Sequence, residues 1–177
     1  MTISIKPTAT GSTIEQDGST ILTVDGSGNI TPSNQLYPKV PAFSAYVSSN
    51  QSVAHNTFTK ITYDIEHFDT NSNYDHTTNY RFTPTVAGYY QFNIRAELTT
   101  DYLGDVYVAL FKNGSRIHVV GSRQDQENQG VGGSALVYAN GSTDYFEGYM
   151  FHTIGSSVNT SNYAQGSHFQ GFLARAV

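Results

Sequence analysis

Alternating apolar and polar positions dominate the chain, most clearly in residues 90–98. Every second side chain there is apolar and would share one face: Tyr90, Phe92, Ile94, Ala96 and Leu98. A period of two is typical of a half-buried β-strand. Just before it, Pro84 cannot donate to a strand ladder and Gly88 gives a permissive backbone position. Residues 80–92 therefore predict two strands joined by a tight turn.

Similar short apolar segments recur to the end of the chain, separated by turn residues. The strands expected are residues 42–47, 58–65, 105–112, 117–120, 134–138, 144–152 and 169–176. Asn113-Gly114 predicts a hairpin turn, and the polar stretches 69–79 and 124–133 predict loops. Roughly ten short strands with regular turns are typical of an antiparallel sandwich or barrel.

Some of these strands are apolar on both faces. In residues 144–152, Tyr145, Tyr149 and Phe151 share one face, while Phe146 and Met150 lie on the other. A single sandwich core covers only one of them, so we expect an identical subunit to cover the second face. The alternative leaves the tyrosine hydroxyls of that face in contact with water.

Residues 1–40 differ from the rest, being rich in Ser, Thr, Gly and Asp with only small β-like islands. Asp25-Gly26 predicts a turn between strands at residues 21–24 and 29–31. This segment has too little apolar material for a core in one copy, so it is either a flexible leader or shares a core with neighbouring copies. Residues 33–41, with two prolines, predict a linker. The expected domains are a segment at 1–40 and a head at 41–177.

The composition supports an all-β protein and excludes several partners. Charged residues make up 13% of the chain and aromatic residues 13%, with no tryptophan and no cysteine. The net charge is −5 with no basic run, which argues against nucleic acid binding. No apolar run approaches the ~20 residues of a membrane span, and the N-terminus lacks a signal peptide pattern. We expect synthesis in a cytoplasm and no membrane insertion.

Several short motifs occur in a recognisable order along the chain. They are AFSA (42–45), NYD (73–75), YRFTP (80–84), AGYYQF (87–92), LFKNG (110–114) and FQGFL (169–173). Together they resemble the globular head of complement component C1q, in the C1q/TNF-like jelly-roll superfamily. The resemblance implies a ten-strand antiparallel jelly-roll sandwich, assembled as a homotrimer, that binds ligands through exposed loops.

The chain also departs from secreted C1q relatives. No collagen-like repeat or signal peptide precedes the head, and Asn79 stands where the family usually has glycine. Residues 21–31 resemble short repeats that phage structural proteins use near fibre heads. We therefore expect a virion protein: a non-enzymatic trimeric knob, as capsid decoration or a head or tail fibre tip, that attaches to another virion protein through residues 1–40. The alternative is a soluble bacterial lectin or ligand-type binding protein.

One loop has the spacing of a cation site. Oxygen-bearing side chains stand at alternate positions, Asp69, Asn71, Asn73 and Asp75, which suits a hard cation such as calcium. The spacing resembles the start of an EF-hand loop, but the sixth position is Tyr74 rather than glycine. The twelfth is Tyr80 rather than glutamate. Because Asn and Asp also favour turns, calcium and a plain turn remain alternatives.

No catalytic motif stands out. Residues 130–134 lack both the Gly-x-Ser-x-Gly spacing of a nucleophile elbow and the lysine of a phosphate loop. We expect no enzymatic activity and no cofactor apart from the calcium alternative. Host surface glycan or protein would instead contact Tyr and Asn side chains of four predicted binding loops, at residues 71–79, 102–105, 124–132 and 155–166. The candidate contact residues are Tyr74, Asn79, Tyr102, Asn128 and Tyr163.

Overall fold

The structure is a computed structural model that describes residues 3–32, 40–99, 103–124, 130–163 and 166–177. The chain divides into two compact units, Met1–Pro38 and Lys39–Val177, which we call the N-terminal unit and the head. All regular structure in the described residues is β-strand. These residues include no helix with the length and hydrophobicity needed to cross a bilayer.

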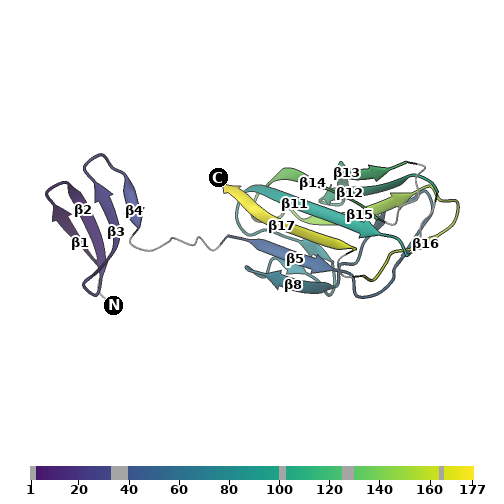
Figure 1. Cartoon of the computed structure of the whole chain (residues 1–177), viewed down its shortest axis with the longest axis horizontal. Helices are drawn as coiled ribbons and strands as arrows, with labels where there is room; N and C mark the ends of the chain where they lie inside the picture. The colour runs from purple at the N-terminus through teal and green to yellow at the C-terminus, as the bar shows by residue number, and fades with distance from the viewer. Residues whose placement is uncertain (1–2, 33–39, 100–102, 125–129, 164–165) are drawn as a thin grey trace. The chain divides into compact units, whose positions relative to one another are not determined.

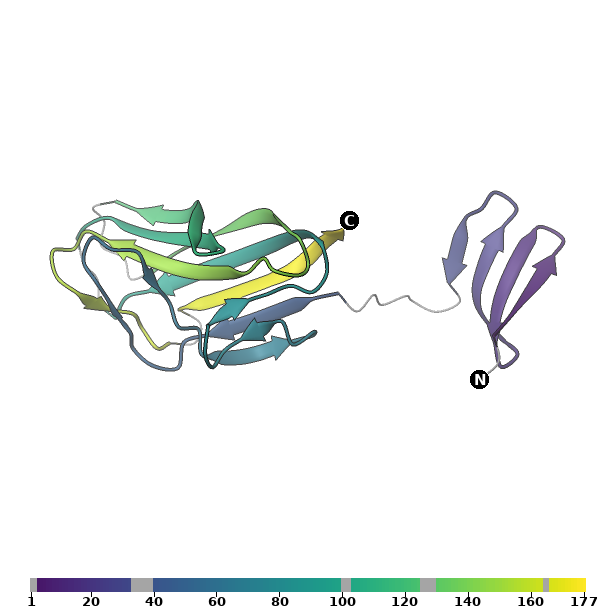
Figure 2. The same ribbon diagram turned by 180° about the vertical axis from the view of Figure 1, so that it is seen from behind.

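The head is a sandwich of two antiparallel sheets (Figures 1 and 2). The first sheet has the order β14-β11-β17-β5-β8, with bounds Gly130–Ala139, Gly88–Glu97, His168–Ala176, Ala42–Tyr46 and Ile65–Asp69. The second has the order β13-β12-β15-β10-β9, with bounds Ser115–Arg123, Val106–Lys112, Phe146–His152, Arg81–Phe82 and Tyr74–Asp75. The short strand β7 (Thr59–Lys60) also pairs with β15, and β6 (Ser52–Val53) pairs with β16 (Val158–Asn159).

The core lies between the two sheets and is mainly aromatic. The alternation predicted in β11 is confirmed, since Tyr90, Phe92 and Ile94 are all fully buried. The Phe43 ring stacks on Phe82 at 4.4 Å, joining the two layers. Offset and edge-to-face contacts of this kind add to the free energy of burying the ring area.

Some sequence predictions were wrong in detail. The strand expected at residues 58–65 is a strand only at Thr59–Lys60 and at Ile65, where β8 begins. Residues 80–92 do contain two strands, but β10 and β11 belong to opposite sheets, so the segment between them crosses the sandwich. Residues 130–133 are the first part of β14 rather than a loop. Their glycines fit because β13 passes close by: a Cβ on Gly133 would lie 1.7 Å from the Val120 carbonyl oxygen.

The hairpin predicted at Asn113-Gly114 is confirmed between β12 and β13. Both residues have positive φ, 52° and 76°, which two-residue turns of this hand require. Chain entry and chain end meet at one end of the head, where Leu173 N donates to Pro41 O and Val177 N to Ala87 O. We call this the entry end.

The N-terminal unit is a four-stranded antiparallel meander. Its strands are β1 (Ile3–Thr8), β2 (Gly11–Gln16), β3 (Ser19–Asp25) and β4 (Ile30–Pro32). The predicted turn between β3 and β4 is present, and Asp25 fixes it by accepting hydrogen bonds from Ser27 N and Asn29 N. A second hairpin turn, Asp17-Gly18, was not predicted, although both residues adopt the positive φ that this dipeptide favours.

Candidate ligand-binding surfaces

The loops opposite the entry end are braced against one another; we call them the loop end (described residues 48–57, 103–105, 153–163 and 166–167). Thr160 N donates to Gln51 O at 2.8 Å, and Asn162 N donates to Asn50 Oδ1 at 2.9 Å. Across the same end, Thr153 N donates to Asp105 O at 2.9 Å. Such bracing holds several loops in one surface without regular structure.

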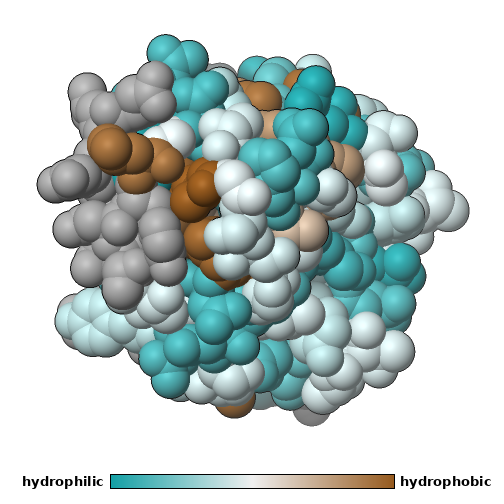
Figure 3. Space-filling view, turned by 90° about the vertical axis from the view of Figure 1, so that its right-hand side faces the viewer, coloured by the Kyte–Doolittle hydropathy of each residue, from teal (hydrophilic) through white to brown (hydrophobic). Residues whose placement is uncertain are grey.

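Figure 3 views the head from this side and shows a mostly hydrophilic surface, with a small hydrophobic strip beside the grey residues. Tyr163, a predicted contact residue, lies here with 55% of its surface exposed. Two others, Tyr102 and Asn128, lie outside the described residues. The described strand ends on either side of the predicted loop 124–132 also lie here, because Arg123 pairs with Val106 and Gly130 pairs with Glu97.

A pocket of about 370 Å³ opens beside the loop end, on the outer face of the second sheet. We call it the aromatic pocket; its lining residues are Phe58, Asp105, Tyr107, Arg116, Val119, Phe151 and Thr153. The Arg116 guanidinium lies 4.7 Å from the Phe58 ring centroid, within cation–π range. Asp105 Oδ2 accepts a hydrogen bond from the Tyr107 hydroxyl at 3.3 Å. A ring-shaped ligand would meet aromatic faces flanked by one carboxylate and one guanidinium.

The rest of this outer face is also aromatic and packs on itself. Phe58 contacts both Phe111 and Phe151, with centroids 5.7 and 5.0 Å away, and Phe111 stacks on Tyr149 at 3.8 Å. All of these rings are half-buried. The apolar second face predicted for residues 144–152 therefore exists, but the chain covers part of it with its own Phe58.

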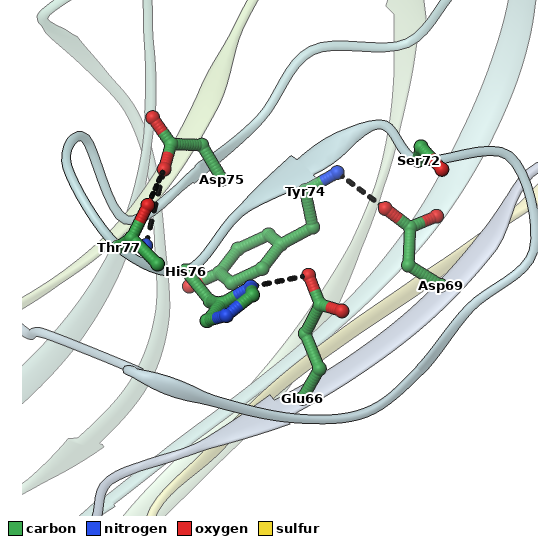
Figure 4. A pocket seen from close by; sticks show the side chains of 7 residues that line it. All are labelled: Glu66, Asp69, Ser72, Tyr74, Asp75, His76 and Thr77. Atoms are coloured by element: carbon green, nitrogen blue, oxygen red, sulfur yellow. Dashed lines mark hydrogen bonds and ion pairs between the residues drawn. The ribbon is translucent and has the colours of Figure 1, made fainter.

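The predicted cation loop lies elsewhere, near the entry end, because Asp69 pairs with Phe43 at the start of β5. Here an acidic pocket of about 290 Å³ is lined by Glu66, Asp69, Ser72, Tyr74, Asp75, His76 and Thr77 (Figure 4). His76 Nδ1 and Glu66 Oε1 are 2.9 Å apart, and the contact between them is drawn in the figure.

The carboxylates of Asp69 and Asp75 point to opposite sides of Tyr74 in Figure 4. Asp69 accepts hydrogen bonds from Asn71 N and Tyr74 N, the latter at 2.6 Å. Asp75 accepts from the backbone N–H groups of Thr77, Thr78 and Asn79 and from both side chains at 77 and 79. These bonds, led by that from Thr78, hold the pKa of Asp75 well below its usual range.

The two asparagines of the proposed calcium set have similar local roles. Asn71 Oδ1 accepts a hydrogen bond from the Thr70 hydroxyl, and buried Asn73 accepts from the backbone and hydroxyl of Thr85. Among the described residues, no three His, Cys, Asp or Glu side chains gather as metal ligands. Calcium at Asp69, Asn71, Asn73 and Asp75 stays a prediction, and the hydrogen bonds that Asp69 and Asp75 accept are those of the turn alternative.

The other two predicted contact residues serve the fold. Tyr74 is 5% exposed; its hydroxyl donates to Tyr63 O at 2.9 Å and its ring stacks on Phe43 at 4.9 Å. Asn79 Nδ2 donates to Asp75 Oδ2 at 2.7 Å, and its carbonyl oxygen accepts from Lys60 Nζ. Of the four predicted binding loops, this one does not join the loop end.

The first sheet has an exposed outer face that sequence reasoning did not single out. We call it the open apolar face; its members are Phe68, Tyr89, Leu136, Tyr138 and Phe172, each 43–56% exposed. Strand register places them on one side: Tyr89 pairs with Tyr138, and Gln91 pairs with both Leu136 and Phe172. The sequence did hold a signal for this face. In β11 the residues between the buried positions point outward, and one of them, Tyr89, is aromatic.

Arg95 and Glu97 near this face compensate each other's charge, while Arg175 lies beside Tyr89 and Leu136. Arg95 donates to Glu97 and to Gly166 O, both at 2.5 Å, where the face reaches the loop end. Gln91 and Asn93 occupy the middle of the face, so it is apolar towards the entry end and polar towards the loops. Exposed apolar surface of this kind is typical of a protein–protein contact.

The head is thus a two-layer antiparallel sandwich with an exposed apolar outer face on its first sheet. The C1q domain family matches residues 42–174, most of the chain, so the protein belongs to that family. The all-β jelly-roll prediction is thereby confirmed, and trimers are typical of the family. No curated protein sequence matches the chain.

Solved structures show the same fold. The globular domain of zebrafish complement 1qA protein has a TM-score of 0.58 at 18% identity, covering 78% of this chain and 99% of that one. The Eiger TNF of S. frugiperda gives 0.55 at 10% identity, covering 78% and 94%. Murine APRIL gives 0.54 at 9% identity, covering 76% and 98%.

Proposed function

We propose that this protein is a non-enzymatic structural protein of a virion: a trimeric C1q-like knob carried on an N-terminal attachment segment. It decorates a capsid or forms the tip of a head or tail fibre, and it adheres to the host surface. The observation that supports the trimer is the open apolar face. Each of its half-exposed side chains would gain on the order of 1 kcal/mol on full burial.

The ligand surface is the loop end together with the aromatic pocket. Phe58, Tyr107 and Phe151 offer ring faces for the C–H side of a sugar or for an apolar side chain. Arg116 and Asp105 at the pocket rim supply a donor and an acceptor for polar groups. A host surface glycan or protein fits this combination.

Residues 1–40 supply the attachment to another virion protein. Met1–Pro38 form a compact unit of their own, and the sequence of residues 33–41, with two prolines, suits a linker to the head. In this proposal the protein is made in the cytoplasm of the host cell and assembles onto particles there.

Deleting residues 1–34 tests the virion role. The truncated protein is expected to remain a trimer, with three times the mass of the shortened chain, and to lose its incorporation into particles. The matched control is Arg116→Ala, which should leave incorporation unchanged. Normal incorporation of the truncated protein would contradict the attachment role.

The aromatic pocket also favours a second candidate, a soluble bacterial lectin or ligand-type binding protein. A glycan array on the purified protein separates the two when combined with the incorporation assay. Glycan binding that Arg116→Ala weakens, with no incorporation of the full chain into particles, would favour the lectin.

A further inference from the structure

Among the described residues of the N-terminal unit, all isoleucines, leucines and valines but one lie on one side of a single sheet. Register pairs Ile5 with Ile14 and Ile14 with Leu22, and it pairs Val24 with Ile30. Since alternate residues of a strand share a face, we define the stalk face by six residues: Ile3, Ile5, Ile14, Leu22, Val24 and Ile30. Ile21 lies at the irregularity between β2 and β3 and is left out of this set.

Nothing in the described part of the unit covers the stalk face. Ile3, Ile5 and Ile30 are 58%, 70% and 63% exposed, and no residue from 3 to 31 is buried. In the head, by contrast, alternate residues of β11 are fully buried. A stable domain needs two packed layers, and four strands in one layer leave the aliphatic side chains in water.

The opposite side of the sheet is polar and charged. Lys6 and Glu15 form an ion pair there, and Thr13, Thr23 and Thr31 follow one another across the strands. The stalk face itself carries no charged residue. Copies of this face can therefore approach one another without like-charge repulsion, whereas the other side cannot serve as a core.

We infer that the stalk faces of three chains pack against one another around the molecular threefold axis and form a second core, separate from that of the head. This inference rests on the trimer of the proposed function. The head would hold three N-terminal units on linkers of a few residues, at an effective concentration in the millimolar range. Three single-layer sheets, each apolar on one side, close into a prism whose polar sides face solvent.

The occupant of the stalk face is thus the chain itself rather than the virion partner. The outer polar sides and the edge strands β1 and β4 remain available for attachment. The segment 1–40 then has two roles on two surfaces, a stalk core inside and a contact surface outside.

The test uses the full chain with Ile14→Asp at the centre of the stalk face, and Thr13→Asp as the control one residue away on the opposite side. Light scattering gives the mass of the trimer, and hydrogen exchange gives the protection of β1–β4. Ile14→Asp is expected to speed exchange in β1–β4 at least tenfold while the mass stays at three chains. Thr13→Asp should stay within about twofold of the wild-type protein.

Cross-linking gives a second readout, because the chain contains no cysteine. Ile30→Cys should form disulfide-linked chain pairs on mild oxidation of the trimer, and Thr31→Cys, on the opposite side, should not. Equal cross-linking of both variants, or equal exchange in both aspartate variants, would overturn the inference.

The outcomes also separate this inference from the proposed function. A trimer whose β1–β4 exchange freely, and become protected only on particles, means that a virion protein covers the stalk face; the shared core is then wrong and the trimer stands. A monomeric full-length protein would overturn both.

Discussion

The outer faces of the two head sheets are both aromatic, but they differ in what covers them. On the second sheet, Phe58 lies over Phe111 and Phe151, and the rings bury one another within one chain. On the first sheet, Leu136 and Phe172 are about half exposed, with no such cover in the described chain. Aromatic content alone therefore does not identify a subunit contact. The face to look for is the one whose aromatic side chains are left exposed by the rest of the same chain.

The same comparison extends to the N-terminal unit, where exposure is greater still. Ile3, Ile5 and Ile30, 58–70% exposed, are more exposed than any residue of the open apolar face, and the unit has no second layer among its described residues. Both units thus leave apolar side chains exposed in the single chain. A single assembly of several chains that buries both surfaces is the simplest arrangement.

The largest expected effect is the loss of the trimer on Leu136→Glu. An unpaired charge placed in a subunit contact costs roughly 3–5 kcal/mol per chain, and the open apolar face would contribute three such charges near one axis. Light scattering should show the mass fall from three chains of 19.4 kDa to one.

The matched control is Val119→Glu. Val119 is 48% exposed, close to the 56% of Leu136, but it lies on the second sheet beside the aromatic pocket. The mass of the Val119→Glu protein should stay at that of three chains. Dissociation of the Val119 variant with an intact Leu136 variant would reverse the assignment of the two faces.

A smaller effect is expected for Phe58→Ala, which removes the chain's own cover from the second sheet. Fully buried Phe→Ala changes cost roughly 3–5 kcal/mol, so this half-buried ring should cost about 2 kcal/mol of unfolding free energy. Denaturant unfolding measures the loss, and the mass should remain that of the trimer.

Phe172→Ala provides the contrasting variant. In a single chain this ring is 44% exposed, so its removal should mainly weaken assembly. Diluting the protein would then shift its mass towards one chain at a higher concentration than for the wild type. If Phe58→Ala showed the stronger dependence on concentration, the second sheet would be the subunit contact.

Much of the head could be predicted from the sequence because period-two patterning and turn dipeptides act locally. The β11 core positions and the Asn113-Gly114 hairpin follow from residues that are neighbours in the chain. Sheet membership could not be predicted in this way: β10 and β11 are adjacent in sequence but lie in different layers. The glycines at 130–133 suggested a loop because glycine is common in turns. Their actual role, making room for the close approach of β13, cannot be read from neighbouring residues.

The candidate sites show the same limit. Asp69 and Asp75 were selected for ligand spacing, but each accepts hydrogen bonds from its own turn, which an Asx residue does in any tight loop. The aromatic pocket was not foreseen, because Phe58, Tyr107 and Phe151 come from three separate segments. Their proximity depends on the pairing of β12 with β15 and on the path of residues 54–58 across it.

The smallest expected effect is on the pH dependence of stability, and it concerns Tyr149 on the second sheet, whose outer face Phe58 partly covers. Burial, with Glu147 nearby, raises its pKa to about 12 from the usual 10.0. Between pH 10 and about 12, Tyr149 therefore stays protonated in the folded state but loses its proton in the unfolded chain. The associated stability is fully present below pH 10 and is lost as the pH rises through about 12.

Tyr149→Phe tests this linkage and keeps the ring that stacks on Phe111 at 3.8 Å. The free energy of unfolding, measured at a series of pH values, should fall less steeply between pH 10 and 12 in the variant than in the wild type. Some slope remains, because burial also raises the pKa of Tyr90 to about 12. An unchanged slope would mean that water reaches Tyr149 freely, and the second sheet would then be as open as the first.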